Sequence, residues 1–310
     1  MVVSIDGLNP QALTTLGAAG APTIVRLEGE GVSTRNARST FDETETLPNH
    51  TSMVTGRRVA LPGGHGVTFN EDDQSTVHDT AGQYVTSAFD VVHDRGGSTA
   101  LYAGKPKFGF LNRSWNGTNG APDAVGADNG RDKIDTYLQV TSGATSTDAL
   151  VADIGAGTLA DLTVLHLAEP DQAGHASGYL SPAYLTALTQ TDARLGQVVD
   201  ALAGSPGYAD DTVLVVTSDH GGTGTVHSDA TQAVNYTIPF LVWGPGVAAG
   251  QDLYALNPAR LDPGTGRPAD TATNPPVRNG DVANLATDLL GLPSVPGSTY
   301  GPGQDLRLAP

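Results

Sequence analysis

Three apolar stretches of the chain each lead into side chains that could bind a metal ion. The stretches and the candidate ligands after them are 2–5 with Asp6, 162–167 with Asp171, and 212–217 with Asp219 and His220. In open α/β sheets, ligands bind beyond the carboxyl ends of the strands, so these side chains should converge on one crevice. A single aspartate after a strand is often only a turn or cap residue. The prediction of a metal site therefore rests on the convergence of all three.

The spacing within two of these groups suits metal coordination. Asp171 and His175 stand four residues apart and can face one ion from a single turn of chain. Asp219 and His220 are adjacent and can share an ion only where the chain leaves the extended conformation, which the two glycines after them permit. His227 lies a short loop further on, and without these neighbours it would be interpreted as a surface histidine. Its position makes it a further candidate ligand.

The composition narrows the chemistry that these residues can perform. The chain has 310 residues, no cysteine, a formal net charge of -17 and a pI of about 4.5. Disulfides, thiolate metal sites and cysteine nucleophiles are therefore excluded, and any metal must sit on Asp, Glu and His. The acidic surface argues against binding to nucleic-acid polymers or anionic lipid. No run approaches the ~20 apolar residues of a membrane-spanning helix.

The elements that would position the candidate ligands alternate between strands and helices. Short apolar runs rich in β-branched residues indicate buried parallel strands at 2–5, 99–103, 162–167, 212–217 and 238–243. Helical patterns separate these runs along the chain. We therefore predict an α/β fold in which helices sandwich a mostly parallel central sheet.

Two helices and two loops are clear in the pattern. One helix begins at Ser181, with proline at its first position, and ends at Gly204. A second spans about 281–290 and should bury an apolar face made of Val282, Leu285, Leu289 and Leu290. The stretches 111–132 and 257–278 are rich in Gly, Asn, Asp and Pro and predict long surface loops. With no internal repeat and no linker, residues 1–310 are interpreted as one catalytic α/β domain.

Four motifs resemble the signatures of a known family. They are Ser4-Ile5-Asp6-Gly7, Thr46-Leu47-Pro48-Asn49-His50-Thr51, Glu169-Pro170-Asp171 with Gly174-His175, and Ser218-Asp219-His220-Gly221. In order and residue type they look like those of the nucleotide pyrophosphatase/phosphodiesterase branch of the alkaline phosphatase superfamily. The resemblance spans roughly 2–247, with a looser tail over 279–298. It implies an alkaline-phosphatase-like fold.

The resemblance also implies a two-metal site with a threonine nucleophile. One divalent ion would be bound by Asp6, Asp219, His220 and the Thr46 oxygen, and the other by Asp171, His175 and His227. Mixed Asp/His ligation suits Zn²⁺, with Mn²⁺ or Mg²⁺ as alternatives. A threonine hydroxyl is protonated at neutral pH, and coordination to a divalent ion stabilises its alkoxide for attack on phosphorus. The expected intermediate is a phosphothreonine, which water then hydrolyses.

Three more residues are expected to bind substrate. The segment from His65 to Asn70 resembles the family's His-Gly segment whose asparagine donates a hydrogen bond to the phosphoryl group, so we choose Asn70 over Asn49, which is expected to cap a helix. Only three lysines occur, and two of them, Lys105 and Lys107, follow the predicted strand at 99–103. They resemble the Lys-x-Lys pair of some alkaline phosphatases and phosphonoacetate hydrolases that holds substrate oxygens. The alternative is a solvated basic loop.

The leading function is hydrolysis of phosphate esters, with phosphodiesters or nucleotide pyrophosphates favoured by the motifs. A phosphomonoesterase or a phosphonate hydrolase is the alternative, and the lysine pair would suit the extra charge of a monoester. A sulfatase is disfavoured because the commonest sulfatase nucleophile is made from cysteine. The non-enzyme alternative is an inactive metal-stabilised binding protein, against which the retained Thr46 argues.

The expected partner is a small phosphate ester or nucleotide, and the oligomeric state stays open. Met1 is followed at once by the first apolar strand, without the charged and apolar regions of a signal peptide. An extracellular or periplasmic location is therefore an expectation from the resemblance alone.

Overall fold

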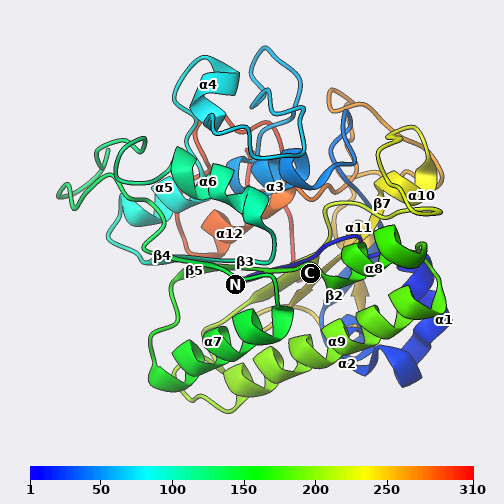
Figure 1. The fold of residues 1–310 in the computed structure, drawn as a ribbon. Helices are drawn as coiled ribbons and strands as arrows, with labels where there is room; N and C mark the ends of the chain where they lie inside the picture. The colour runs from blue at the N-terminus through cyan, green and yellow to red at the C-terminus, as the bar shows by residue number, and fades with distance from the viewer.

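The computed structural model describes residues 1–310 and contains one eight-stranded sheet with helices on both faces (Figure 1). The strands are β1 Val2–Ile5, β2 Val32–Arg38, β3 Thr99–Ala103, β4 Thr136–Gln139, β5 Leu162–Leu167, β6 Leu214–Thr217, β7 Thr237–Trp243 and β8 Gln251–Asp252. The helices are α1 Pro10–Gly20, α2 Pro22–Glu30, α3 Thr46–Thr55, α4 Val77–Ala81, α5 Ala88–His93, the 3₁₀ turn η1 Pro106–Phe108, α6 Gly109–Ser114, α7 Gly143–Ala156, α8 Glu169–Ser177, α9 Pro182–Ala203, α10 Ala233–Tyr236, α11 Leu253–Leu256 and α12 Asp281–Leu289.

The sheet has the order β4-β3-β5-β1-β6-β7-β2-β8. The first strand lies near the middle, where Val2 pairs in parallel with Val164 of β5 and with Val215 of β6. From β4 to β6 all neighbours are parallel, so the carboxyl ends of these five strands lie along one edge. The predicted α/β architecture with a mostly parallel sheet is confirmed.

Two features of the sheet differ from the sequence prediction. β7, expected as a parallel strand, runs antiparallel to both β6 and β2. An apolar run indicates that a strand is buried but says nothing about the direction in which the strand runs. β2, β4 and β8 were not predicted, because their polar residues hide the strand pattern, as in the sequence VSTRNAR of β2.

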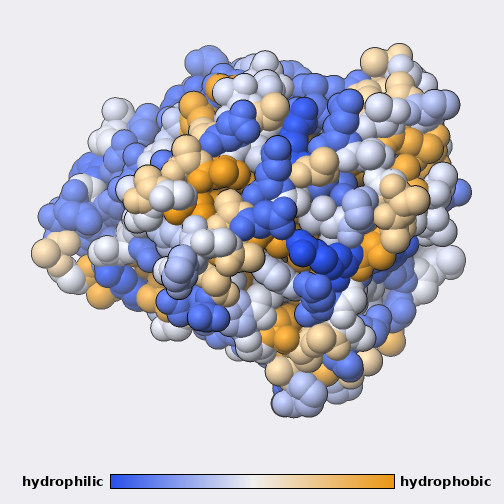
Figure 2. Space-filling view, turned by 90° about the horizontal axis from the view of Figure 1, so that it is seen from below, coloured by the Kyte–Doolittle hydropathy of each residue, from blue (hydrophilic) through white to orange (hydrophobic).

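Each face of the sheet is covered by its own helical layer (Figure 1). Helices α1, α2, α7 and α9 cover one face, and α3, α5, α6 and α12 cover the other. Alternation along β1 sends Val2 into one apolar core and Val3 and Ile5 into the other. Seen from the α7 and α9 side, the surface mixes hydrophilic and apolar side chains without a continuous apolar face (Figure 2).

The helices follow their sequence signals closely, with one exception. Ser181 caps α9 by accepting a hydrogen bond from the Tyr184 amide at 3.2 Å, as its position before proline predicts. In α12, Val282 and Leu285 are buried, but Leu289 lies at the end of the helix and is 38% exposed. The expectation that it joins the core is therefore wrong, and the same holds for Leu290.

None of the helices combines the length and the apolar composition that a membrane-spanning segment requires.

Candidate active site

The candidate ligands meet because their strands are neighbours. Asp6 follows β1, Asp219 follows β6, and Asp171 lies in α8, which begins two residues after β5. Lys105 follows β3 and occupies the residue before η1. Since β3, β5, β1 and β6 are adjacent and parallel, all four side chains lie at the same edge of the sheet.

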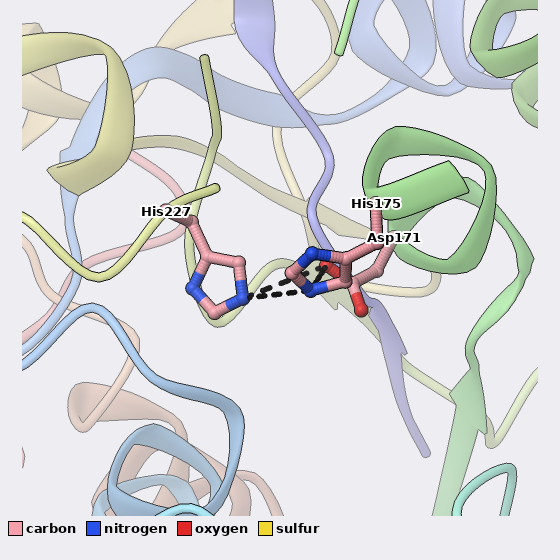
Figure 3. A group of neighbouring side chains, drawn as sticks. All are labelled: Asp171, His175 and His227. Carbon is pink, nitrogen blue, oxygen red and sulfur yellow. Dashed lines mark hydrogen bonds and ion pairs between the residues drawn. The ribbon is translucent and has the colours of Figure 1, made fainter. Parts of the chain in front are cut away.

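The first group of ligands consists of Asp171, His175 and His227 (Figure 3). Asp171 and His175 come from one turn of α8, and His227 reaches them from the loop after β6. The Nε2 atoms of the two histidines lie 3.2 Å apart, and each lies within 4 Å of Asp171 Oδ1, at 3.4 Å from His175 and 3.8 Å from His227. The loop after β6 thus brings His227, which is distant in sequence, next to Asp171 and His175.

The second group consists of Asp6, Asp219 and His220 and is completely buried. His220 Nε2 lies 3.4 Å from Asp6 Oδ1 and 3.3 Å from Asp219 Oδ2. The two groups are neighbours, because the rings of His220 and His227 stack with centroids 3.6 Å apart and an interplanar angle of 8°.

The hydrogen bonding of both groups fits metal cations. Each histidine has its Nδ1 against a backbone carbonyl: His175 on Thr225 at 2.9 Å, His227 on Thr44 at 2.6 Å and His220 on Gly221 at 2.8 Å. A carbonyl oxygen only accepts, so Nδ1 carries the hydrogen and the Nε2 lone pair is free for a cation. Asp6 Oδ1, Asp219 Oδ2 and His220 Nε2 are buried without any hydrogen-bond partner. Buried polar atoms are rarely left in this state, and a divalent ion would satisfy all three.

Thr46 and Lys105 lie between the two groups. Thr46 is the first residue of α3 and is buried. Lys105 Nζ lies 2.6 Å from Asp6 Oδ2, 2.6 Å from Asp171 Oδ2 and 3.3 Å from Thr46 Oγ1. The ammonium group therefore bridges one carboxylate from each group and holds the threonine hydroxyl beside both.

Burial and charge together shift the pKa values of the site. Burial alone would raise the pKa of Asp6, but the Lys105 ammonium and the hydrogen bond from His166 hold it well below its usual range. Burial raises the pKa of Asp219 well above its usual range, and the Asp6 carboxylate raises it further. Burial also lowers the pKa of His227 to about 4, which keeps the ring neutral. The carboxyl groups of Asp6, Asp171 and Asp219 outnumber the single ammonium group of Lys105. Divalent cations would reverse this excess of acidic groups.

Comparison with known proteins identifies the architecture around this site. A profile of the type I phosphodiesterase / nucleotide pyrophosphatase family matches residues 1–259. The chain belongs to this family. Ectonucleotide pyrophosphatase/phosphodiesterase family member 1 of Mus musculus is 27% identical over 234 residues, which are 71% of this chain and 24% of that protein. The Homo sapiens protein of the same name is 28% identical over 233 residues, 71% of this chain and 23% of its own length. The chain thus spans about 24% of the length of these curated relatives.

Solved structures carry the same fold as this phosphodiesterase-family chain. An inactive form of murine ectonucleotide pyrophosphatase/phosphodiesterase 5 in complex with AMP matches with a TM-score of 0.67 at 16% identity, covering 98% of both chains. A second structure of that murine protein matches with a TM-score of 0.66 at 16% identity over 95% of each chain. The fold expected from the motifs, an alkaline-phosphatase-like α/β sandwich, is therefore confirmed.

The two other residues predicted to bind substrate, Asn70 and Lys107, line an open pocket of about 690 Å³ together with Thr46 and Lys105. The side-chain oxygen of Asn70 accepts a hydrogen bond from the Leu47 amide at 3.0 Å, which ties Asn70 to the start of α3. Its amide nitrogen donates to the Glu45 carboxylate. Lys107 lies at the pocket rim, paired with Glu71 at 3.2 Å.

Asn49 has a different place from the one expected. It lies inside α3 and does not cap a following helix. Its side-chain oxygen accepts from the Thr40 amide at 2.9 Å, and its nitrogen donates to the carbonyls of Glu43 and Glu45, both at 2.9 Å. Asn49 thus fixes the loop that precedes the nucleophile candidate.

Three residues that support the phosphodiesterase-family site were not found from the sequence. His166 in β5 contacts Asp6 Oδ2 through Nε2 at 2.9 Å, while its Nδ1 accepts from the Gly104 amide at 3.2 Å. The Gly104 amide can only donate, so His166 carries its hydrogen on Nε2 and donates it to Asp6. His50 in α3 and Tyr179 after α8 contact Ser4 and Asp171 respectively. For His166, the sequence offered one signal, which is a histidine inside the apolar run of β5.

Proposed function

We propose that the chain is a metal-dependent hydrolase of phosphate esters that uses Thr46 as its nucleophile. The observation that carries the proposal is the place of Thr46, at the first turn of α3 and beside two groups of Asp and His whose free lone pairs fit cations. Family membership supports the same class of reaction. Phosphodiesters or nucleotide pyrophosphates are the favoured substrates, with phosphomonoesters or phosphonates as the alternative.

Two divalent cations, Zn²⁺ by preference, would be held by the two groups and would stabilise the attacking and leaving oxygens as Lewis acids. The chain's own residues do the rest. Lys105 Nζ, 3.3 Å from Thr46 Oγ1, favours the alkoxide by its positive charge. Thr46 is the first residue of α3, so the partial positive charge at the amino end of the helix dipole also favours the alkoxide. Attack of Oγ1 on a phosphodiester breaks one ester bond, releases one alcohol and forms a phosphothreonine that keeps the other ester group. Water then breaks the bond to Oγ1 and returns the free threonine and a phosphate monoester; from a monoester substrate the same two steps give phosphate.

The substrate side of the proposal assigns Asn70 to the phosphoryl oxygens. Its amide nitrogen is oriented by Glu45 and retains a second hydrogen for the substrate. Residues 1–310 are proposed to form a single catalytic α/β domain. We also propose that the protein acts outside the cytoplasm, which the prefix ecto- in the names of its relatives supports.

The test compares wild type with Thr46→Ala and Thr46→Ser on bis-p-nitrophenyl phosphate and p-nitrophenyl phosphate. The alanine variant should lower kcat by at least about a thousandfold, since it lacks the nucleophile, whereas serine should retain part of the rate. Near-wild-type turnover by Thr46→Ala would exclude threonine as the nucleophile. Chelation should abolish turnover, and elemental analysis should find two divalent ions per active chain.

A further inference from the structure

One tyrosine, Tyr179, contacts the Asp171 group, which consists of Asp171, His175 and His227. The Tyr179 hydroxyl donates a hydrogen bond to Asp171 Oδ1. The Tyr179 backbone amide donates to the Gly224 carbonyl at 2.7 Å, in the loop that leads to His227. Tyr179 thus holds one ligand through its side chain and the segment before another ligand through its backbone.

The buried ring of Tyr179 is enclosed by glycines. Gly178 ends α8 with a φ of 94°, which glycine adopts without strain, and Tyr179 follows directly. A Cβ atom added to Gly7, Gly174 or Gly222 would lie 3.1, 2.7 or 2.4 Å from the Tyr179 ring. These three glycines belong to the loop after β1, to α8 and to the loop after β6. The ring therefore fills a space that only glycine leaves open, and the position of its hydroxyl is fixed.

The hydroxyl binds the carboxylate oxygen of Asp171 that faces the two histidines (Figure 3). Nε2 of His175 lies 3.4 Å from Asp171 Oδ1, and Nε2 of His227 lies 3.8 Å from it. Lys105 holds the other oxygen, Oδ2, at 2.6 Å. A carboxylate oxygen has two lone pairs, so Oδ1 retains one for a cation after it accepts from Tyr179. The hydroxyl therefore sets the rotation of the carboxylate and the direction of its remaining lone pair.

The Asp6 group, which consists of Asp6, Asp219 and His220, has no contact of this kind. Asp6 Oδ1 and Asp219 Oδ2 are buried without a hydrogen-bond partner. No hydrogen bond joins the Tyr179 hydroxyl to either carboxylate. Loss of this hydroxyl therefore removes a contact from the Asp171 group and none from the Asp6 group.

We propose that Tyr179 is a positioning residue whose hydroxyl orients Asp171 for the binding of a divalent cation. This inference rests on the proposed metal-dependent hydrolysis and adds a residue to it. Groups that hydrogen-bond to metal ligands typically contribute 10- to 100-fold to metal affinity. The hydroxyl strengthens cation binding at the Asp171 group by about tenfold, at the lower end of that range, because Lys105 also holds the carboxylate.

The experiment measures Zn²⁺ binding to the metal-free full chain by competition with a chelator of known affinity. Tyr179→Phe removes the hydroxyl and keeps the ring between its glycines. His175→Ala removes one ligand of the Asp171 group, so the binding step that it weakens is assigned to that group. Tyr179→Phe should weaken the same step about tenfold and leave the other step as in wild type.

Tyr184 provides a matched control, because it is also a buried tyrosine and its ring centroid lies 5.5 Å from that of Tyr179. Its hydroxyl bonds only to backbone groups, the Gly7 carbonyl at 2.7 Å and the Asn9 amide at 3.1 Å. Tyr184→Phe therefore removes a buried hydroxyl that touches no ligand side chain. Both Zn²⁺ binding steps should stay as in wild type, and thermal melting establishes that each variant is folded.

Equal Zn²⁺ binding by Tyr179→Phe and wild type would overturn the inference. An equal loss in Tyr179→Phe and Tyr184→Phe, or a loss spread over both steps, would overturn it as well, since either result indicates a general effect on packing. Binding is measured without turnover, so the two proposals fail separately. A wild type that binds two ions and hydrolyses no phosphate ester would refute the proposed function alone.

Discussion

Lys105 should stabilise the metal-free protein far more than its neighbour Lys107 does. Its ammonium group lies 2.6 Å from Asp6 and 2.6 Å from Asp171, and both carboxylates are buried. Lys105→Met keeps most of the length of the unbranched side chain and removes the charge. Removing one partner of a buried ion pair typically costs about 3–5 kcal/mol, because the remaining charge has no solvent and no partner. Lys107→Met breaks only an exposed pair and should cost at most about 1 kcal/mol.

The assay is urea unfolding at pH 7.5 with a chelator present, repeated with an excess of Zn²⁺. In chelator, Lys105→Met should lose about 3–5 kcal/mol of the free energy of unfolding relative to wild type. With Zn²⁺ present, the loss should shrink to about half or less, because bound cations neutralise the same carboxylates. A loss no larger than that of Lys107→Met, or one that Zn²⁺ leaves unchanged, would refute the role assigned to Lys105.

Three further outcomes follow from the structure. His166→Leu should weaken cation binding at the Asp6 group about 10- to 100-fold in calorimetric titration, with His166→Gln intermediate, and equal affinity would contradict the hydrogen-bond role. Burial lowers the pKa of His65 to about 3, so its contribution to stability is complete above pH 6.5 and is lost as the pH falls. Between pH 7.5 and 5.5, wild type should lose about 1.4 kcal/mol more than His65→Gln in urea unfolding, and equal losses would contradict this assignment. Gly222→Ala would place a Cβ 2.4 Å from the Tyr179 ring and should lower stability by about 1–3 kcal/mol, whereas an unchanged melting temperature would show that the ring can move.

Much of the fold could be predicted from the sequence because the central strands are short, apolar runs. The strands before Asp6, Asp171 and Asp219 are buried on both faces, so their sequences are mostly apolar, and a candidate ligand follows within four residues of each. The direction of β7 and the strand at 32–38 could not be read in this way. Direction depends on how the chain returns to the sheet, and β2 is only partly buried along its length.

The position of the candidate metal ligands could be predicted from the sequence, because it depends only on where the strands end. The seven predicted metal-site residues gather at the sheet edge because strand ends converge there. The state of each lysine was not readable, since Lys105 and Lys107 have the same chemistry and differ only in what surrounds them. The role of His166 could not be predicted either. A histidine inside an apolar run indicates a buried polar side chain, but the sequence does not say that it contacts Asp6.

The central position of β1 has a consequence during synthesis of the chain. Val2 pairs with Val164 and Val215, so β1 leaves the ribosome without either neighbour and has both only after about 210 more residues have been added. At roughly 5–20 residues per second, the wait lasts about 10–40 s. During that time an apolar strand edge is available for pairing with other chains, and no cation can be held at Asp6. Slow release of β1 by a ribosome-bound chaperone should therefore increase the soluble yield more than it changes the stability of the finished protein.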